Sequence, residues 1–172
     1  MKRQIEYFSM RSFFARVLLF LGVGANVLFF GSCSDDNKDD IYPVIDMSGK
    51  NAFPLNCSVV RPGESFTFRA VFSDNRELGA YSIEIHHNFD HHTHSTDVVE
   101  CEMEPEKEPD HPFQFIEEYE IPPGQKRYEA EVEISVPDTA DTGDYHFMVR
   151  LTDASGWQTL KGISIKIMDE EE

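Results

Sequence analysis

The strongest constraint on the fold of this chain is an alternation of apolar and polar residues with a period of two. It recurs in five segments, which are residues 66–72, 81–86, 128–136, 145–151 and 163–167. Successive side chains of a β-strand point to opposite faces, so each segment predicts an antiparallel strand with one buried and one wet face. From residue 51 onward no stretch has the apolar spacing of a helix.

Turn-forming residues separate these segments at Pro62-Gly63, Pro122-Pro123-Gly124 and Ser155-Gly156. Short strands divided by such turns predict an all-β fold, an immunoglobulin-like antiparallel β-sandwich over residues 51–168. In immunoglobulin order, strands A, B, C, E, F and G are expected near residues 53–59, 65–72, 78–86, 128–136, 144–152 and 157–167. The connection from C to E, residues 87–127, is a long insertion, and long insertions in compact domains tend to be functional or disordered.

A local motif and the cysteines refine this prediction. Asp141, Gly143 and Tyr145 resemble the corner that enters strand F of immunoglobulin-like domains, where a buried tyrosine hydroxyl bonds to the backbone. Phe147 stands where an antibody domain carries its second cysteine, so the usual disulfide between strands B and F is absent. Cys57 and Cys101 are a candidate disulfide pair, and they could equally be small buried hydrophobes.

The N-terminus has the pattern of a secretory signal. Four basic residues precede the apolar stretch 17–30, which at 14 residues is too short to span a bilayer as a permanent helix. The sequence Phe30-Gly31-Ser32-Cys33 resembles a bacterial lipobox, so we expect a signal peptide over residues 1–32 and a lipid anchor on Cys33. A plain signal peptide is the alternative, and translation could start at Met1 or at Met10.

Residues 33–50 are expected to form the lipidated cysteine and an acidic, solvated tether, and residues 169–172 an acidic tail. The acidic run behind Cys33 resembles the export signal of surface lipoproteins, which predicts an outer-membrane anchor with the domain facing the cell exterior. Without the signal segment, 11 basic and 31 acidic residues remain, a net charge of −20. This charge repels phosphate backbones, so no nucleic-acid partner is expected.

The chemically distinctive passage is a histidine-rich tract at the start of the insertion. Five of the seven histidines lie between residues 86 and 94. Neutral imidazoles are preferred ligands for zinc and copper, and Asp90 can act as a further ligand or can orient a histidine. The tract therefore favours a metal site for zinc or copper, with no organic cofactor, over a solvated polar loop.

Sandwich topology adds a distant residue to this site. Strands C and F are antiparallel neighbours in immunoglobulin-like domains, so His86 at the end of C and His146 at the start of F are predicted to be adjacent. An exposed sheet residue is the alternative interpretation of His146. The predicted ligand set is His86, Asp90, His92, His94 and His146.

The lipobox, the acidic tether, the sandwich strands and the stretch from Asn88-Phe89-Asp90 to His94 together resemble an uncharacterised family of Bacteroidetes-type lipoproteins. The resemblance covers nearly all of the mature chain and implies a fold and a location rather than an activity. His91 stands where this family commonly has glycine, so the resemblance makes it the weakest candidate ligand.

No H-E-x-x-H, G-x-S-x-G or Walker motif is present, so an enzyme is not expected. A hydrolytic zinc site with Glu84 as base is the alternative. Residues 97–120 hold ten carboxylates among prolines, and we interpret them as a solvated loop rather than a calcium site.

Two functions of different classes follow from these observations. One is a surface lipoprotein that binds a divalent transition metal and passes it to an outer-membrane transporter or another surface protein. The other is a metal-free adhesion or accessory module that binds protein or glycan.

Overall fold

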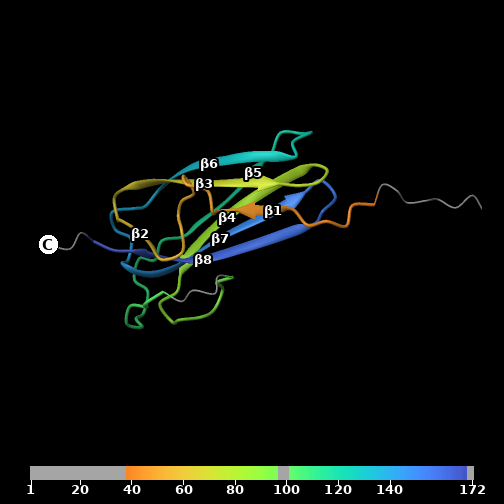
Figure 1. The fold of residues 1–172 in the computed structure, drawn as a ribbon. Helices are drawn as coiled ribbons and strands as arrows, with labels where there is room; N and C mark the ends of the chain where they lie inside the picture. The colour runs from red at the N-terminus through yellow and green to blue at the C-terminus, as the bar shows by residue number, and fades with distance from the viewer. Residues whose placement is uncertain (1–37, 97–100, 170–172) are drawn as a thin grey trace, which may run out of the picture. The chain divides into compact units, whose positions relative to one another are not determined.

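The computed structural model describes residues 38–96 and 101–169, so the predicted signal peptide and Cys33 lie outside the described residues. In these ranges eight strands form two sheets. The two sheets lie face to face (Figure 1). The strands are β1 (Val44–Asp46), β2 (Ser58–Val60), β3 (Ser65–Ser73), β4 (Leu78–His87), β5 (Phe115–Glu120), β6 (Arg127–Ser135), β7 (Gly143–Asp153) and β8 (Gln158–Ile167). Within the described ranges there is no helix long and apolar enough to cross a membrane.

One sheet has the strand order β1-β3-β6 and the other the order β2-β8-β7-β4-β5. All neighbours are antiparallel except β2 and β8, which are parallel. The predicted strands B, C, E, F and G correspond to β3, β4, β6, β7 and β8, so the immunoglobulin-like sandwich is confirmed.

The core lies between the two sheets and is built by the alternation seen in the sequence. Phe68 and Phe72 of β3 meet the other sheet, where the Phe68 ring lies 5.5 Å from that of Phe147 and the Phe72 ring 5.0 Å from that of Tyr81. Fully burying such a side chain contributes about 1.5–3 kcal/mol relative to leaving it exposed. The opposite face of β4 and β7 carries mainly polar residues, with the apolar Met148 among them.

The first strand differs from the prediction. Strand A was expected over residues 53–59, whereas the structure has β1 and the short β2, and Phe53 makes only an isolated bridge to Arg69. The domain also begins at Asp39, because Asp39 and Met47 are buried and β1 pairs with β3. Residues 39–50 therefore belong to the sandwich and not to the tether.

The long insertion contains a strand that was not predicted. Residues 115–120 were interpreted as part of a solvated acidic loop, but they form β5, which pairs with β4 at the sheet edge. Only Phe115 and Tyr119 are partly buried, with the Tyr119 ring stacked 5.0 Å from Tyr81. Charged residues suit an edge strand because they discourage pairing with other chains, and they also hide its pattern.

The residues of the predicted corner lie together at the start of β7. Tyr145 is fully buried, and its hydroxyl donates to the Asp141 carbonyl at 2.7 Å and accepts from the Phe113 amide at 3.2 Å. Gly143 has a φ of 131°, and an added Cβ would lie 2.9 Å from the Phe89 ring. The corner thus fixes the start of β7, and with it the position of the residues that follow.

Candidate metal centre

The site begins where β4 ends beside the start of β7. His86 and His146 are cross-strand partners, as the predicted topology required. Both side chains lie on the outer face of the five-stranded sheet, because their neighbours Ile85 and Phe147 fill the core. His146 is not exposed, however, since only 2% of it is accessible.

The residues after β4 cover His146 by folding back over the sheet. The Asn88 amide donates to the Asp144 carbonyl at 2.7 Å, and His91 adopts a left-handed φ of 56° that reverses the chain. At the far end of the loop, the Thr96 amide donates to the Gly162 carbonyl at 2.8 Å. This double attachment places His92 and His94 over His146.

Four imidazole rings consequently gather at one point. The ring centres of His86, His92, His94 and His146 are separated by 4.9 to 5.6 Å in all six pairs. One nitrogen from each of His86, His92 and His94 lies within 4.8 Å of the other two.

These separations match the size of a tetrahedral site. A zinc–nitrogen bond of about 2.0–2.1 Å, plus about 1.2 Å to the ring centre, puts each ring centre about 3.2 Å from the ion. Four rings at the corners of a regular tetrahedron would then be about 5.2–5.3 Å apart. The observed range brackets this value, so the four ring centres have the spacing of a tetrahedral imidazole site.

Hydrogen bonds orient the rings of His92 and His146, and a carboxylate lies beside that of His86. Asp90 contacts Nδ1 of His92, and the Glu84 carboxylate lies 3.1 Å from Nδ1 of His86. Nε2 of His146 is 2.9 Å from the His92 carbonyl, which accepts only, so Nε2 carries the proton and Nδ1 has the free lone pair. Metal-binding histidines are commonly held in this way.

A buried ring nitrogen without a hydrogen-bond partner supports a metal site here. Nδ1 of His146 is buried and has no hydrogen-bond partner among the described residues. Burial is the largest cause that lowers the pKa of His146, to about 4, although the His92 carbonyl opposes it. Burial also lowers the pKa of His86, against the opposing effect of Glu84. Both rings are therefore neutral at pH 7, as metal ligands must be.

Other residues of the tract do not join the cluster. His91 points to the segment after Cys101, where Nε2 lies 2.9 Å from the Glu104 carbonyl. Its backbone has a left-handed φ of 56°, a conformation that glycine adopts more readily than other residues. The His87 ring lies 4.9 Å from that of Phe89. Asp90 reaches the site through His92, which holds the pKa of Asp90 below its usual range.

Gly162, which was not among the predicted site residues, positions His94. A Cβ at Gly162 would lie 2.4 Å from the His94 carbonyl oxygen and 2.7 Å from the Met148 sulfur. Only glycine allows the loop to approach β8 this closely. A single glycine within a strand pattern was the available signal, since it marks a close approach of another backbone.

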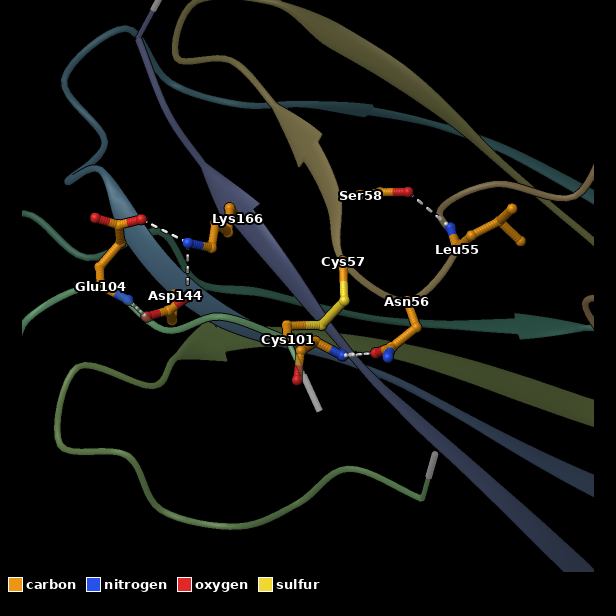
Figure 2. The surroundings of a disulfide bond; sticks show 9 residues. Leu55, Asn56, Cys57, Ser58, Cys101, Glu104, Asp144 and Lys166 are labelled. Atoms are coloured by element: carbon orange, nitrogen blue, oxygen red, sulfur yellow. Dashed lines mark hydrogen bonds and ion pairs between the residues drawn. A yellow bond between two sulfur atoms is a disulfide. The ribbon is translucent and has the colours of Figure 1, made fainter. Parts of the chain in front are cut away.

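The structure also forms the candidate disulfide, between Cys57 and Cys101 with Cα atoms 5.5 Å apart. Figure 2 shows that it joins the turn before β2 to the segment before Glu104. Nearby, Lys166 pairs with Glu104 and lies 3.9 Å from Asp144, and the Asn56 side chain accepts a bond from Ser164 at 2.9 Å. These contacts attach the insertion to β8 on the side of the sheet that carries His146.

A groove of about 660 Å³ extends from the cluster along the outer face of the sheet. His86 and His94 line one end, and the exposed side chains of Ile116 and Leu160 line its sides. The histidine cluster therefore opens into this groove at His86 and His94.

Comparison with known proteins places the chain in a family. A family model described as a domain of unknown function (DUF4625) matches residues 31–168. The chain belongs to this family. A search of curated proteins finds no match.

Among solved structures, the DUF4625 chain is similar to one titled "GspB Siglec domain", with 20% sequence identity and a TM-score of 0.41. The match covers 78% of this chain and 61% of that one, so the DUF4625 chain spans about three fifths of the length of that structure.

Proposed function

We propose that this protein is a surface lipoprotein whose immunoglobulin-like domain binds one divalent transition metal ion through His86, His92, His94 and His146. The observation that carries the proposal is the set of six ring separations of 4.9 to 5.6 Å, which has the dimensions of a tetrahedral imidazole site. Nitrogen donors suit zinc or copper rather than calcium or magnesium.

Four protein ligands leave no open coordination position, and closed zinc sites are structural or carry the ion rather than activate water. We therefore infer a protein that captures, buffers or hands over the ion and not an enzyme. His94 is exposed at the mouth of the groove, and an exposed ligand is the natural point of exchange with an outer-membrane transporter or another surface protein.

The lipid anchor on Cys33 and the position on the cell exterior are part of this proposal. They are supported by the lipobox-like residues and the acidic run behind them. The net charge of −20 for the chain without its signal segment also attracts cations toward the domain.

Metal analysis of the untagged full chain in detergent tests the proposal. After incubation with zinc or copper and removal of free ion, we expect about one ion per chain. His92→Gln and His146→Gln should lose it, whereas His111→Gln, which changes an exposed histidine outside the cluster, should keep it. His91→Asn is a second control, because it changes the tract without touching the cluster and asparagine tolerates the left-handed φ.

The groove supports a second candidate function, a metal-free adhesion or accessory module that binds protein or glycan beside the histidines. A wild-type chain that holds no metal after incubation would favour this module and would contradict the metal site.

A further inference from the structure

A second group of potential ligands lies at the far end of the two strands that carry His86 and His146. Asp39 precedes β1, Asp74 lies in the turn between β3 and β4, and Asp153 ends β7. One carboxylate oxygen from each lies within 4.8 Å of the other two. Asp39 and Asp153 are only 8% and 3% exposed, so three negative charges are brought together in a largely buried place.

No basic side chain neutralises this group. Within residues 38–96 and 101–169, no lysine, arginine or histidine lies at ion-pair distance from the three carboxylates. The charge of Arg76 lowers the pKa of Asp39, but Arg76 does not form an ion pair with it. Hydrogen bonds from the Asn75 and Ser155 side chains stabilise the Asp39 carboxylate, and a bound cation would further offset the repulsion among the three carboxylates.

The hydrogen bonds of the group leave two oxygens unused. Asp153 Oδ1 accepts from the amides of Ser155 and Trp157, each at 2.8 Å, and Asp74 Oδ1 accepts from those of Arg76 and Glu77. The second oxygens, Oδ2 of Asp153 and Oδ2 of Asp74, are buried without a hydrogen-bond partner in the described part of the chain. A buried carboxylate oxygen without a partner is costly and points to a missing ligand.

We infer that Asp39, Asp74 and Asp153 bind a calcium ion. The donors are all oxygens, which hard cations prefer, and calcium accepts six to eight of them in irregular geometry, including water. Magnesium requires a tighter octahedron at about 2.0–2.1 Å and retains its waters. Donor oxygens spread over distances up to 4.8 Å fit the larger and more tolerant ion.

The ion would link the first residues of the domain to the turn between β7 and β8. The Trp157 indole donates to the Asp39 carbonyl at 2.8 Å, the Tyr42 ring lies 4.8 Å from the Trp157 ring, and the Thr159 hydroxyl donates to Pro43. Residues 39–43 are therefore already held against the turn between β7 and β8. Calcium bound by Asp39 and Asp153 adds a link between these segments and fixes where the chain enters the domain.

Terbium, a luminescent substitute for calcium, tests this site through Trp157, the only tryptophan of the chain. With the full chain in detergent, excitation of Trp157 should produce terbium emission that calcium suppresses and zinc does not. Calcium at a hundredfold excess over its dissociation constant should also raise the melting temperature by about 5–15 °C.

Asp153→Asn and Asp74→Asn should each remove the terbium signal. Each should also raise, at least tenfold, the calcium concentration needed to increase the melting temperature. Asp74 is only partly buried, so its variant remains informative if Asp153→Asn does not fold. Asp138→Asn, an exposed aspartate of another turn, should behave as wild type. Absence of any calcium effect, or a calcium effect that survives both cluster variants, overturns the assignment.

Discussion

Gly162→Ala tests how the fold builds the metal centre, because the change adds one methyl group and touches no proposed ligand side chain. The new Cβ would lie 2.4 Å from the His94 carbonyl oxygen, whereas ordinary contact begins at 3.4 Å. The Met148 side chain can move away, but the carbonyl belongs to the backbone. The loop that carries His94 must therefore shift by up to about 1 Å, since the strand beneath it is fixed on both sides.

A shift of this size exceeds the tolerance of a metal site, in which ligand distances hold to about 0.2 Å. We expect the zinc affinity of Gly162→Ala to fall about 10- to 100-fold, as it does when the groups that orient ligands are removed. The stability of the metal-free domain should fall by about 1–3 kcal/mol from overpacking. A competition titration against a chromophoric zinc chelator measures the first effect, and urea unfolding measures the second.

Two glycines serve as matched controls. Gly49→Ala adds the same methyl group where nothing lies within 4 Å, so it should change neither quantity. Gly79→Ala brings a Cβ to 3.0 Å from backbone oxygens at the other end of β4, so it should reduce stability and leave zinc affinity unchanged. If Gly162→Ala binds zinc within about twofold of wild type while losing stability, the loop does not position His94 as described here.

The remaining predictions concern the corner, the pH dependence, the ligand pair and the anchor. Tyr145→Phe leaves the Asp141 carbonyl and the Phe113 amide without partners, so urea unfolding should show a loss of about 1–3 kcal/mol, and an unchanged midpoint would contradict the corner. Burial lowers the pKa of His146 to about 4, so below pH 6.5 a proton binds the unfolded chain but not the folded one. The stability of chelator-treated protein is then full above about pH 6.5 and falls by about 3 kcal/mol in total as the pH drops to about 4, and His146→Gln should flatten this curve. His86→Ala and His146→Ala should be strongly non-additive in zinc affinity, and additive losses measured by titration would place them in separate sites. Cys33→Ser should abolish lipid labelling and move the chain to the soluble fraction, and retained membrane association would mean that the apolar segment stays attached.

Most strands could be predicted because a half-buried strand alternates apolar residues on its buried face with polar residues on its exposed face. The alternation in β3, β4, β6, β7 and β8 comes directly from the contact of one face with the core. β5 lacks this alternation because it is an edge strand and most of its side chains are exposed. The strands β1 and β2 have three residues each and are too short to show a period.

The pairing of His86 with His146 could also be predicted, because strand topology fixes it. The path of the insertion could not, and it decides the rest of the site. The close approach at Gly162 holds the loop over the sheet. His146 is therefore buried, which contradicts the alternative interpretation of it as an exposed sheet residue, and Asp90 contacts His92. The acidic group of Asp39, Asp74 and Asp153 is spread over 114 positions of sequence, and only the meeting of two turns with the start of the domain creates it.

X-ray absorption at the zinc edge, measured on the untagged full chain loaded with one equivalent of zinc, tests the central claim most directly. The four-histidine site predicts four nitrogen neighbours at about 2.0–2.1 Å, with the outer-shell scattering of imidazole rings and no sulfur neighbour. His146→Gln should lose one imidazole from this shell, and His111→Gln should lose none. A zinc shell dominated by water or carboxylate oxygens, or a chain that retains no zinc, would contradict the four-histidine site.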